Sequence, residues 1–306
     1  MKQVEERYIS LLTDFGFKRI FGTAMNKDLL ICFLNSLFNG RQVVKDVSYL
    51  NPEHVGEVYT DRKAIFDVYC EGESGEKFIV EMQNAYQAYF KDRSLFYSTF
   101  PIREQAPKGN DWNFKLNHVY TVALLNFNMN EDAFDKEKIR HHVQLCDTAT
   151  HKIFYDKLEF IYVEIAKFNK TLEELETLYE KWLYALKNLY KLTQRPKELC
   201  DKVFDRLFEE AEIAKFTPQE IREYEASKMA YRDIKNSIDT AKQEGLAEGI
   251  EIGKAEGIEL GMEKGMAEGK NQKALDIARN MLADGVDINL IMKYSGLTQE
   301  QIEKMK

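Results

Sequence analysis

The sequence has little of what marks a secreted, membrane-bound or disulfide-rich protein. Its four cysteines in 306 residues are far apart and form no CxxC pair. A disulfide framework or zinc site is therefore not expected, and the chain has the character of a reduced intracellular protein. The first residues lack the apolar core of a signal peptide, and no apolar run is long enough to span a membrane. We expect a cytoplasmic protein that does not contact membranes.

The chain also lacks an excess of positive charge. Its formal net charge is -8 and its pI is about 5.4, which excludes a uniformly basic coat for nucleic acid but permits a local basic cleft. With 44% hydrophobic and 12% aromatic residues, it can bury one large core or two smaller ones.

Up to about residue 170, the apolar patterns predict an α/β core of helices over a sheet. The run at 119–127 is almost wholly apolar, which is typical of a strand buried on both faces. We expect helices over 13–22, 26–38 and 85–104, the last broken by Pro101, and strands over 43–50, 65–69, 78–83, 119–127, 142–146 and 158–165.

The rest of the chain is helical in character. We expect a core over 1–170, a helical extension packed on it over 171–235, a helical tether over 236–270, and a small helical unit over 271–306. In the tether, glycine recurs at every fourth position from Gly245 to Gly269 and forms one stripe on a long helix. Each glycine costs the helix roughly 0.5–1 kcal/mol relative to alanine. We favour a semi-flexible tether, with self-association through the C-terminal helices as the alternative.

The final unit resembles a helix-turn-helix pair around residues 294–298. Residues 298–301 form a capping box, which begins the second helix at Thr298. That helix carries almost no cations that would read bases. We therefore favour a small packing or docking unit over a DNA reader.

The strongest sign of chemistry is a pair of acids in two apolar runs. Asp67 lies within residues 65–69 and Glu81 within residues 78–83, and the glycine-rich link at 72–76 predicts a β-hairpin between them. Strand alternation puts Glu81 and Gln83 on one face, where Asp67 joins them. Two carboxylates in an apolar setting are costly unless a cation neutralises them. Oxygen ligands of this kind suit Mg²⁺ or Mn²⁺.

These residues resemble the PD-(D/E)xK nuclease superfamily, in particular its transposase-associated, Rpn-type branch of recombination-promoting nucleases. The resemblance rests on residues 13–22 (TDFGFKRIFG), 62–68 (RKAIFDV) and 79–83 (IVEMQ), with Arg93 and Tyr97 following. It implies a restriction-endonuclease-like core with a mixed central sheet, followed by a helical region with a long glycine-repeat helix. It further implies that Asp67 and Glu81 bind metal and that the protein is a Mg²⁺-dependent DNA endonuclease linked to recombination or mobile elements.

Gln83 stands where the superfamily's basic motif has lysine, and the Rpn-type branch is similar in using glutamine there. Glutamine can orient a water but cannot supply positive charge. We therefore expect a nearby cation to replace it, with Lys63, Lys91 and Lys18 as candidates, and we expect Lys18, Lys91 and Arg93 to contact DNA.

Ordinary structural roles remain open for several of these side chains. Lys63 could be a surface charge, Lys18 could simply pair with Asp14 four residues earlier, and Arg93 could pair with Glu81. His141 and His142 alternate on a strand without partners at ligand spacing, so we expect structural roles for both.

Three functions compete. The first is the metal-dependent endonuclease, the second a catalytically degenerate relative that binds nucleic acid or protein, and the third an interaction protein that assembles through its helices. Transposase activity proper would require recognition of specific DNA ends, and no base-reading helix is apparent.

Overall fold

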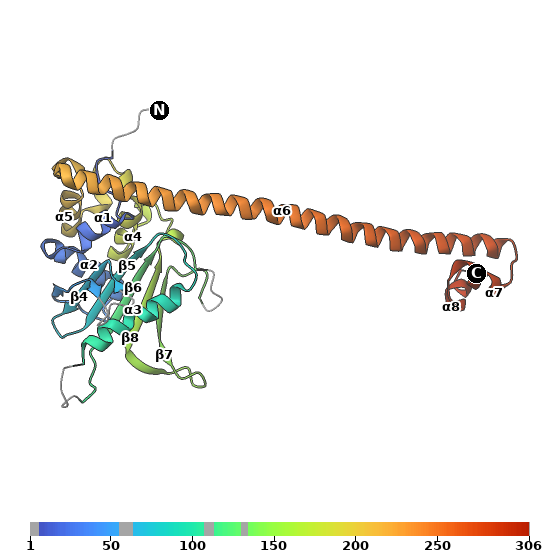
Figure 1. Ribbon diagram of the computed structural model, residues 1–306, viewed down its shortest axis with the longest axis horizontal. Coiled ribbons are helices and arrows are strands. Elements are labelled where there is room, and N and C mark those ends of the chain that lie inside the picture. Colours follow the sequence, from blue (N-terminus) through green and yellow to red (C-terminus); the bar gives the residue numbers. More distant parts are fainter. Residues whose placement is uncertain (1–5, 55–63, 107–112, 130–133, 306) are drawn as a thin grey trace. The chain divides into compact units, whose positions relative to one another are not determined.

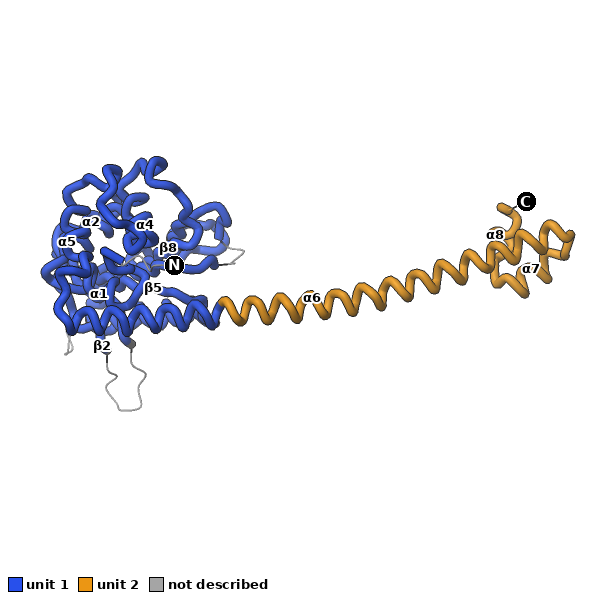
Figure 2. Tube along the Cα trace, turned by 90° about the horizontal axis from the view of Figure 1, so that it is seen from above, with its two compact units in different colours: residues 1–238 blue, residues 239–306 orange. Residues whose placement is uncertain are grey.

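The computed structural model describes residues 6–54, 64–106, 113–129 and 134–305. The chain forms two compact units, residues 1–238 and 239–306 (Figure 2). The α-helices are α1 (Asp14–Phe21), α2 (Lys27–Phe38), α3 (Phe90–Glu104), α4 (Leu178–Asn188), α5 (Lys202–Glu210), α6 (Pro218–Ala283), α7 (Ile288–Ser295) and α8 (Gln299–Glu303). The strands are β1 (Val47–Tyr49), β2 (Glu53–His54), β3 (Ala64–Ile65), β4 (Val68–Gly72), β5 (Lys77–Gln83), β6 (Val119–Leu125), β7 (Arg140–Cys146) and β8 (Ile153–Glu164).

In the described part of the first unit, six strands form one mixed sheet in the order β1-β4-β5-β6-β8-β7. β5 and β8 run parallel to β6, and the other neighbours are antiparallel. β2 and β3 pair separately. The expected mixed sheet with flanking helices is therefore confirmed, as is the fully buried β6.

Helices cover both faces of this sheet (Figure 1). One face packs against α1, α2, α4 and α5 in a single large apolar cluster, to which β5, β6 and β8 contribute Val80, Val122 and Ile161. The opposite face packs against α3, through Phe90 near β6 and β8 and through Tyr97 near Ile79. The central strands are thus shielded from water on both sides, as their apolar runs predict.

Helix α1 begins and ends as its sequence predicts. The Thr13 hydroxyl accepts the Gly16 N–H (3.1 Å), and the chain leaves the helix at Gly22. Gly16 is required by close packing, because a Cβ there would lie 2.1 Å from the carbonyl oxygen of Ser10. The glycine lets the preceding segment lie directly against the helix.

The expected continuous strand over 65–69 is wrong. Ile65 ends β3, which pairs with β2, and the chain then bends at Asp67 before β4 begins at Val68. Asp67 therefore lies at a break between two short strands instead of inside one.

Two other boundaries differ from the sequence prediction. α3 begins at Phe90, not Ala85, because Tyr89 takes a left-handed conformation that interrupts the helix, and the buried Pro101 lies inside α3 without ending it. β1 begins only at Val47, because the Asn35 side chain takes both backbone hydrogen bonds of Val44 (2.8 Å each). Side-chain capping of this kind competes with strand pairing.

α6 is one continuous helix through the glycine repeat, and the repeat glycines are exposed. The second unit has its own apolar cluster, built on Ala278, Ile291, Leu297 and Ile302. Thr298 begins α8 with the capping box that the sequence predicts. None of the helices in the described residues combines the length and apolarity needed to cross a membrane.

Candidate metal-binding carboxylate site

The β4–β5 hairpin brings Asp67 and Glu81 together, as predicted. Val68 pairs with Val80, so continuing this antiparallel register by one residue places Asp67 opposite Glu81. Gly75 sits in the turn with φ of +85°, a conformation that favours glycine. The local sequence of the turn thus fixes which acids face each other.

Each of the two acids is held by the backbone of the other strand. The Asp67 N–H donates to Glu81 Oε1 (3.2 Å), and the Met82 N–H donates to Asp67 Oδ2 (2.8 Å). Gln83 joins them as predicted, since its Nε2 donates to Glu81 Oε2 (3.1 Å). Three predicted site residues therefore converge through hydrogen bonds.

Both carboxyl groups are poorly solvated. The side chain of Glu81 is 8% exposed and that of Asp67 is 20% exposed. Burial, followed by the charge of Asp67, raises the pKa of Glu81 to about 8, and burial also raises the pKa of Asp67. The pair is electrostatically unfavourable when both acids are ionised, so a bound cation would relieve it.

Two cations face the pair from opposite helices. Lys18 Nζ on α1 lies 3.9 Å from Asp67 Oδ1, and Arg93 Nη2 on α3 lies 3.9 Å from Glu81 Oε2. Lys18 also pairs with Asp14 at 2.7 Å, as its spacing predicts. Burial lowers the pKa of Lys18, but the hydrogen bond and charge of Asp14, helped by Asp67 and Glu81, outweigh it and raise that pKa. Lys18 is therefore charged at neutral pH.

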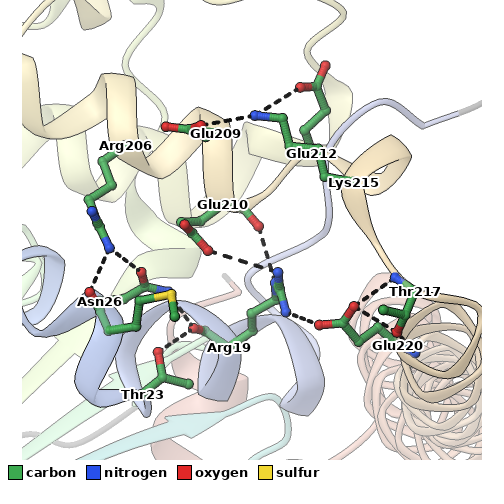
Figure 3. A network of polar contacts seen from close by, with 11 residues as sticks. Arg19, Thr23, Asn26, Arg206, Glu209, Glu210, Glu212, Lys215, Thr217 and Glu220 are labelled. Carbon is green, nitrogen blue, oxygen red and sulfur yellow. Dashed lines mark hydrogen bonds and ion pairs between the residues drawn. The ribbon is translucent and has the colours of Figure 1, made fainter.

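The next residue, Arg19, fixes α1 against α5 and α6 (Figure 3). Its guanidinium donates to the Glu210 carbonyl (3.2 Å), pairs with Glu220 and lies 4.3 Å from the Phe216 ring centre. Arg206 of α5 adds a hydrogen bond to the Met25 carbonyl (2.6 Å), just beyond α1. These contacts hold the helix that presents Lys18.

The structure does not describe every predicted cation. Lys63 lies outside the described residues. Lys91 is exposed on α3. Burial raises the pKa of Tyr162 on β8, and the positive charge of Lys91 offsets part of that rise. Tyr97 packs edge-to-face on Phe66, with ring centres 5.3 Å apart, and lies under Arg93.

The sequence analysis missed two amides at the ends of the parallel strands. Asn84 follows β5 and Asn126 follows β6, and the two side chains are 3.4 Å apart. Asn84 Nδ2 also donates to the Leu12 carbonyl (2.7 Å), which ties the end of β5 to the segment before α1. Their positions immediately after two buried strands are the signal that could have identified them.

The two histidines of β7 have acidic partners away from the carboxylate pair. His141 Nε2 lies 2.8 Å from Glu164 Oε1, and Lys167 lies 3.0 Å from the same oxygen. His142 pairs with Glu159 on β8. Among the described residues, no group of three or more His, Cys, Asp or Glu side chains is arranged to hold a metal ion.

The donor set at Asp67 and Glu81 suits a hard cation. Mg²⁺ is typically bound by one or two carboxylates and keeps waters for its remaining positions, whereas structural zinc needs four protein ligands. Two buried carboxylates with raised pKa values and an adjacent amide match the first pattern.

Two family models match the chain. The family model described as PD-(D/E)XK nuclease family transposase matches residues 11–241. A second model, described as the Rpn/YhgA-like nuclease family C-terminal HTH domain, matches residues 271–306. No curated protein and no solved structure matches the chain.

Proposed function

This chain belongs to the PD-(D/E)XK nuclease family transposases, and on that premise we propose that it is a Mg²⁺- or Mn²⁺-dependent DNA endonuclease. The observation that carries the proposal is the buried pair of opposed carboxylates, Asp67 and Glu81, at the end of a hairpin. The restriction-endonuclease-like form of the core and a link to recombination or mobile elements belong to the same proposal.

Asp67 and Glu81 would hold the cation through their carboxylate oxygens. A bound divalent ion would polarise the scissile phosphate and lower the pKa of an attacking water. The hydrogen bonds from Met82 and Asp67 N–H groups pre-orient both carboxylates. Little side-chain freedom would then be lost when the ion binds.

Gln83 and Lys18 would together replace the lysine of the superfamily's motif, with Gln83 orienting the water and Lys18 supplying the positive charge. The Gln83 amide, fixed on Glu81, is suited to orient the attacking water. Lys18, charged and 3.9 Å from Asp67, is suited to stabilise the negative charge that develops on the phosphate. Arg93 offers a second positive group on the opposite side, next to Glu81.

The second unit, residues 239–306, would bring DNA to the nuclease unit. This part of the proposal rests on the match of residues 271–306 to an HTH domain, and it revises the preference for a packing unit. α8 carries Glu300 and Glu303 and has no lysine or arginine, so we assign it no base-reading role.

Plasmid nicking by the full chain tests the proposal. We expect Mg²⁺ or Mn²⁺ to support conversion of supercoiled to nicked DNA, and EDTA or Asp67→Ala to abolish it. Cleavage that is indifferent to both EDTA and Asp67→Ala would reject the proposal. DNA binding without any cleavage would favour the degenerate, binding-only relative, in which the missing positive charge at Gln83 is not replaced.

A further inference from the structure

Exposed aromatic side chains follow directly after the carboxylate strand. Tyr86 and Tyr89 lie in the loop between β5 and α3 and are 54% and 79% exposed. Phe96, on the outer side of α3, is 43% exposed. Large aromatic groups that are exposed on the segment beside a site are candidates for binding a partner. We call Tyr86, Tyr89 and Phe96 the aromatic surface.

The fold supports two of these rings. Tyr86 packs edge-to-face on Phe127, with ring centres 5.6 Å apart. Phe96 packs edge-to-face on Phe100 at 5.1 Å, and Phe100 contacts Phe66, the residue before Asp67. Phe96 is therefore linked through Phe100 to the ring that precedes Asp67.

Tyr89 is held in an unfavourable backbone conformation. Its φ is +65°, in the left-handed region that residues with a side chain rarely adopt, and it precedes the first residue of α3. A glycine at this position would remove the strain, yet the chain carries one of its most exposed aromatic groups there. Strain of this kind is commonly found at functional sites.

Arg93 connects the aromatic surface with the carboxylates. Its N–H donates to the Tyr89 carbonyl (3.0 Å), and its guanidinium hydrogen-bonds Gln87 and lies 3.9 Å from Glu81. The same guanidinium lies 5.3 Å from the centre of the Tyr97 ring. A cation between exposed rings and a phosphate-cleaving site matches a nucleic acid, which presents a phosphate and a base at adjacent positions.

We propose that the aromatic surface stacks on unpaired nucleobases, so that the preferred substrate is DNA with a single-stranded stretch next to the cleaved bond. Bases in an intact duplex are stacked on each other and offer no face to a protein ring, whereas unpaired bases stack readily on tyrosine and phenylalanine. The recessed carboxylates favour the same substrate, because a flexible strand can bend into a site whose acids are 8% and 20% exposed. This inference rests on the proposed nuclease function and names its substrate class.

Binding without metal tests the inference separately from cleavage. Fluorescence anisotropy in EDTA would compare a single-stranded oligonucleotide with the duplex of the same sequence, using the full chain. The variants are Tyr89→Ala, Tyr86→Ala and Tyr89→Phe, with Phe154→Ala as the control, since Phe154 is 81% exposed on β8. Each lost stacking contact weakens binding by at least about fivefold.

We expect Tyr89→Ala and Tyr86→Ala each to weaken binding of the single strand at least about fivefold. Tyr89→Phe and Phe154→Ala should leave that binding unchanged. Duplex binding should respond little to any of them. Equal affinity of all variants for the single strand would overturn the inference, as would an equal loss for duplex and single strand. Equal affinity of all variants would indicate instead that the aromatic surface meets a protein, and an equal loss for both forms would indicate a DNA contact that does not need unpaired bases.

Cleavage assays separate this inference from the nuclease proposal. On a gapped duplex with Mg²⁺, we expect cuts within or beside the gap, and Tyr89→Ala should reduce them at least about fivefold. Efficient cleavage of intact duplex that is unaffected by Tyr89→Ala would reject the inference and leave the nuclease standing. Stacking-dependent binding with no metal-dependent cleavage would reject the nuclease and leave the aromatic surface standing.

Discussion

Asp67 and Glu81 hold each other in place: the backbone N–H of Asp67 donates to the Glu81 carboxylate, and the Asp67 carboxylate accepts the N–H of Met82, the residue after Glu81. Each acid is at once a candidate metal ligand and a backbone acceptor that orders the end of the hairpin. The metal-binding role of each acid can therefore be separated from its structural role only by a substitution that keeps the hydrogen-bond acceptor and removes the charge.

Asp67→Asn and Asp67→Ala should differ in stability but not in activity. Both remove the charge, and the loss of several kcal/mol of charge stabilisation corresponds to a decrease in cleavage of at least about 100-fold. Only alanine removes the acceptor of the Met82 N–H, at a cost of about 1–3 kcal/mol. We expect the Tm of Asp67→Ala to lie at least about 2 °C below that of Asp67→Asn. Equal Tm values would show that the Met82 contact adds nothing to stability.

The metal-free protein should lose stability as the pH rises. The folded pKa of Glu81, about 8, lies above the unfolded value of 4.5. Between these values the folded state binds more protons than the unfolded state, so the free energy of unfolding falls with pH. The stability contributed by Glu81 is complete below pH 4.5 and is lost as the pH rises past about 8.

Glu81→Gln removes this titration and tests the assignment. In EDTA, we expect the variant to have a Tm at pH 8 at least about 2 °C above the native protein, with a flatter dependence between pH 5 and 9. Glu159→Gln serves as a control, because Glu159 is a buried acid on β8 that has histidine partners. An unchanged pH profile in Glu81→Gln would contradict the raised pKa.

Lys18 should contribute to cleavage through its positive charge, independently of its ion pair with Asp14. We expect Lys18→Ala to slow cleavage about 100-fold, as loss of a group that stabilises developing charge does, and Lys18→Arg to restore part of the rate. Asp14→Asn should leave the rate near that of the native protein, since it removes the helix ion pair but keeps Lys18 beside Asp67. Lys27→Ala, at an exposed pair with Asp46, is the matched control.

If Lys18 acts only through its ion pair, Asp14→Asn will reduce cleavage as much as Lys18→Ala. If Lys18→Ala, Lys63→Ala and Lys91→Ala each cleave at the full rate, then none of these lysines replaces the motif lysine whose position Gln83 occupies.

Removal of the second unit should affect binding more than chemistry. The first unit has its own large core, so a chain of residues 1–238 is expected to fold. We expect it to cleave a short oligonucleotide at the native rate but to bind long duplex DNA more weakly and with a smaller dependence on salt. Measuring the mass of both chains tests the alternative of assembly through the helices, which predicts a smaller oligomer after truncation.

The local parts of the site could be predicted from the sequence because short-range patterns determine them. The turn at Gly75 and the spacing from Asp67 to Glu81 set the hairpin register, and alternation places Gln83 beside Glu81. The i,i+4 pair of Asp14 and Lys18 follows in the same way.

The remaining features depend on contacts between distant segments. The approach of Lys18 to Asp67 requires α1 to pack at the hairpin, which its own sequence does not specify. The pairing of His141 with Glu164 needs β7 beside β8 in one particular register. Pro101 removes a backbone hydrogen bond from α3, yet the helix continues to Glu104, held by its packing against the sheet.

Calorimetric titration of Mg²⁺ into the full chain at pH 8 tests the central claim most directly, because it asks whether Asp67 and Glu81 together hold a divalent cation. We predict one binding site in the native protein, with partial proton release because the protonated fraction of Glu81 must ionise, and loss of that site in both Asp67→Asn and Glu81→Gln. Binding of Mg²⁺ with unchanged affinity in both variants would contradict the account.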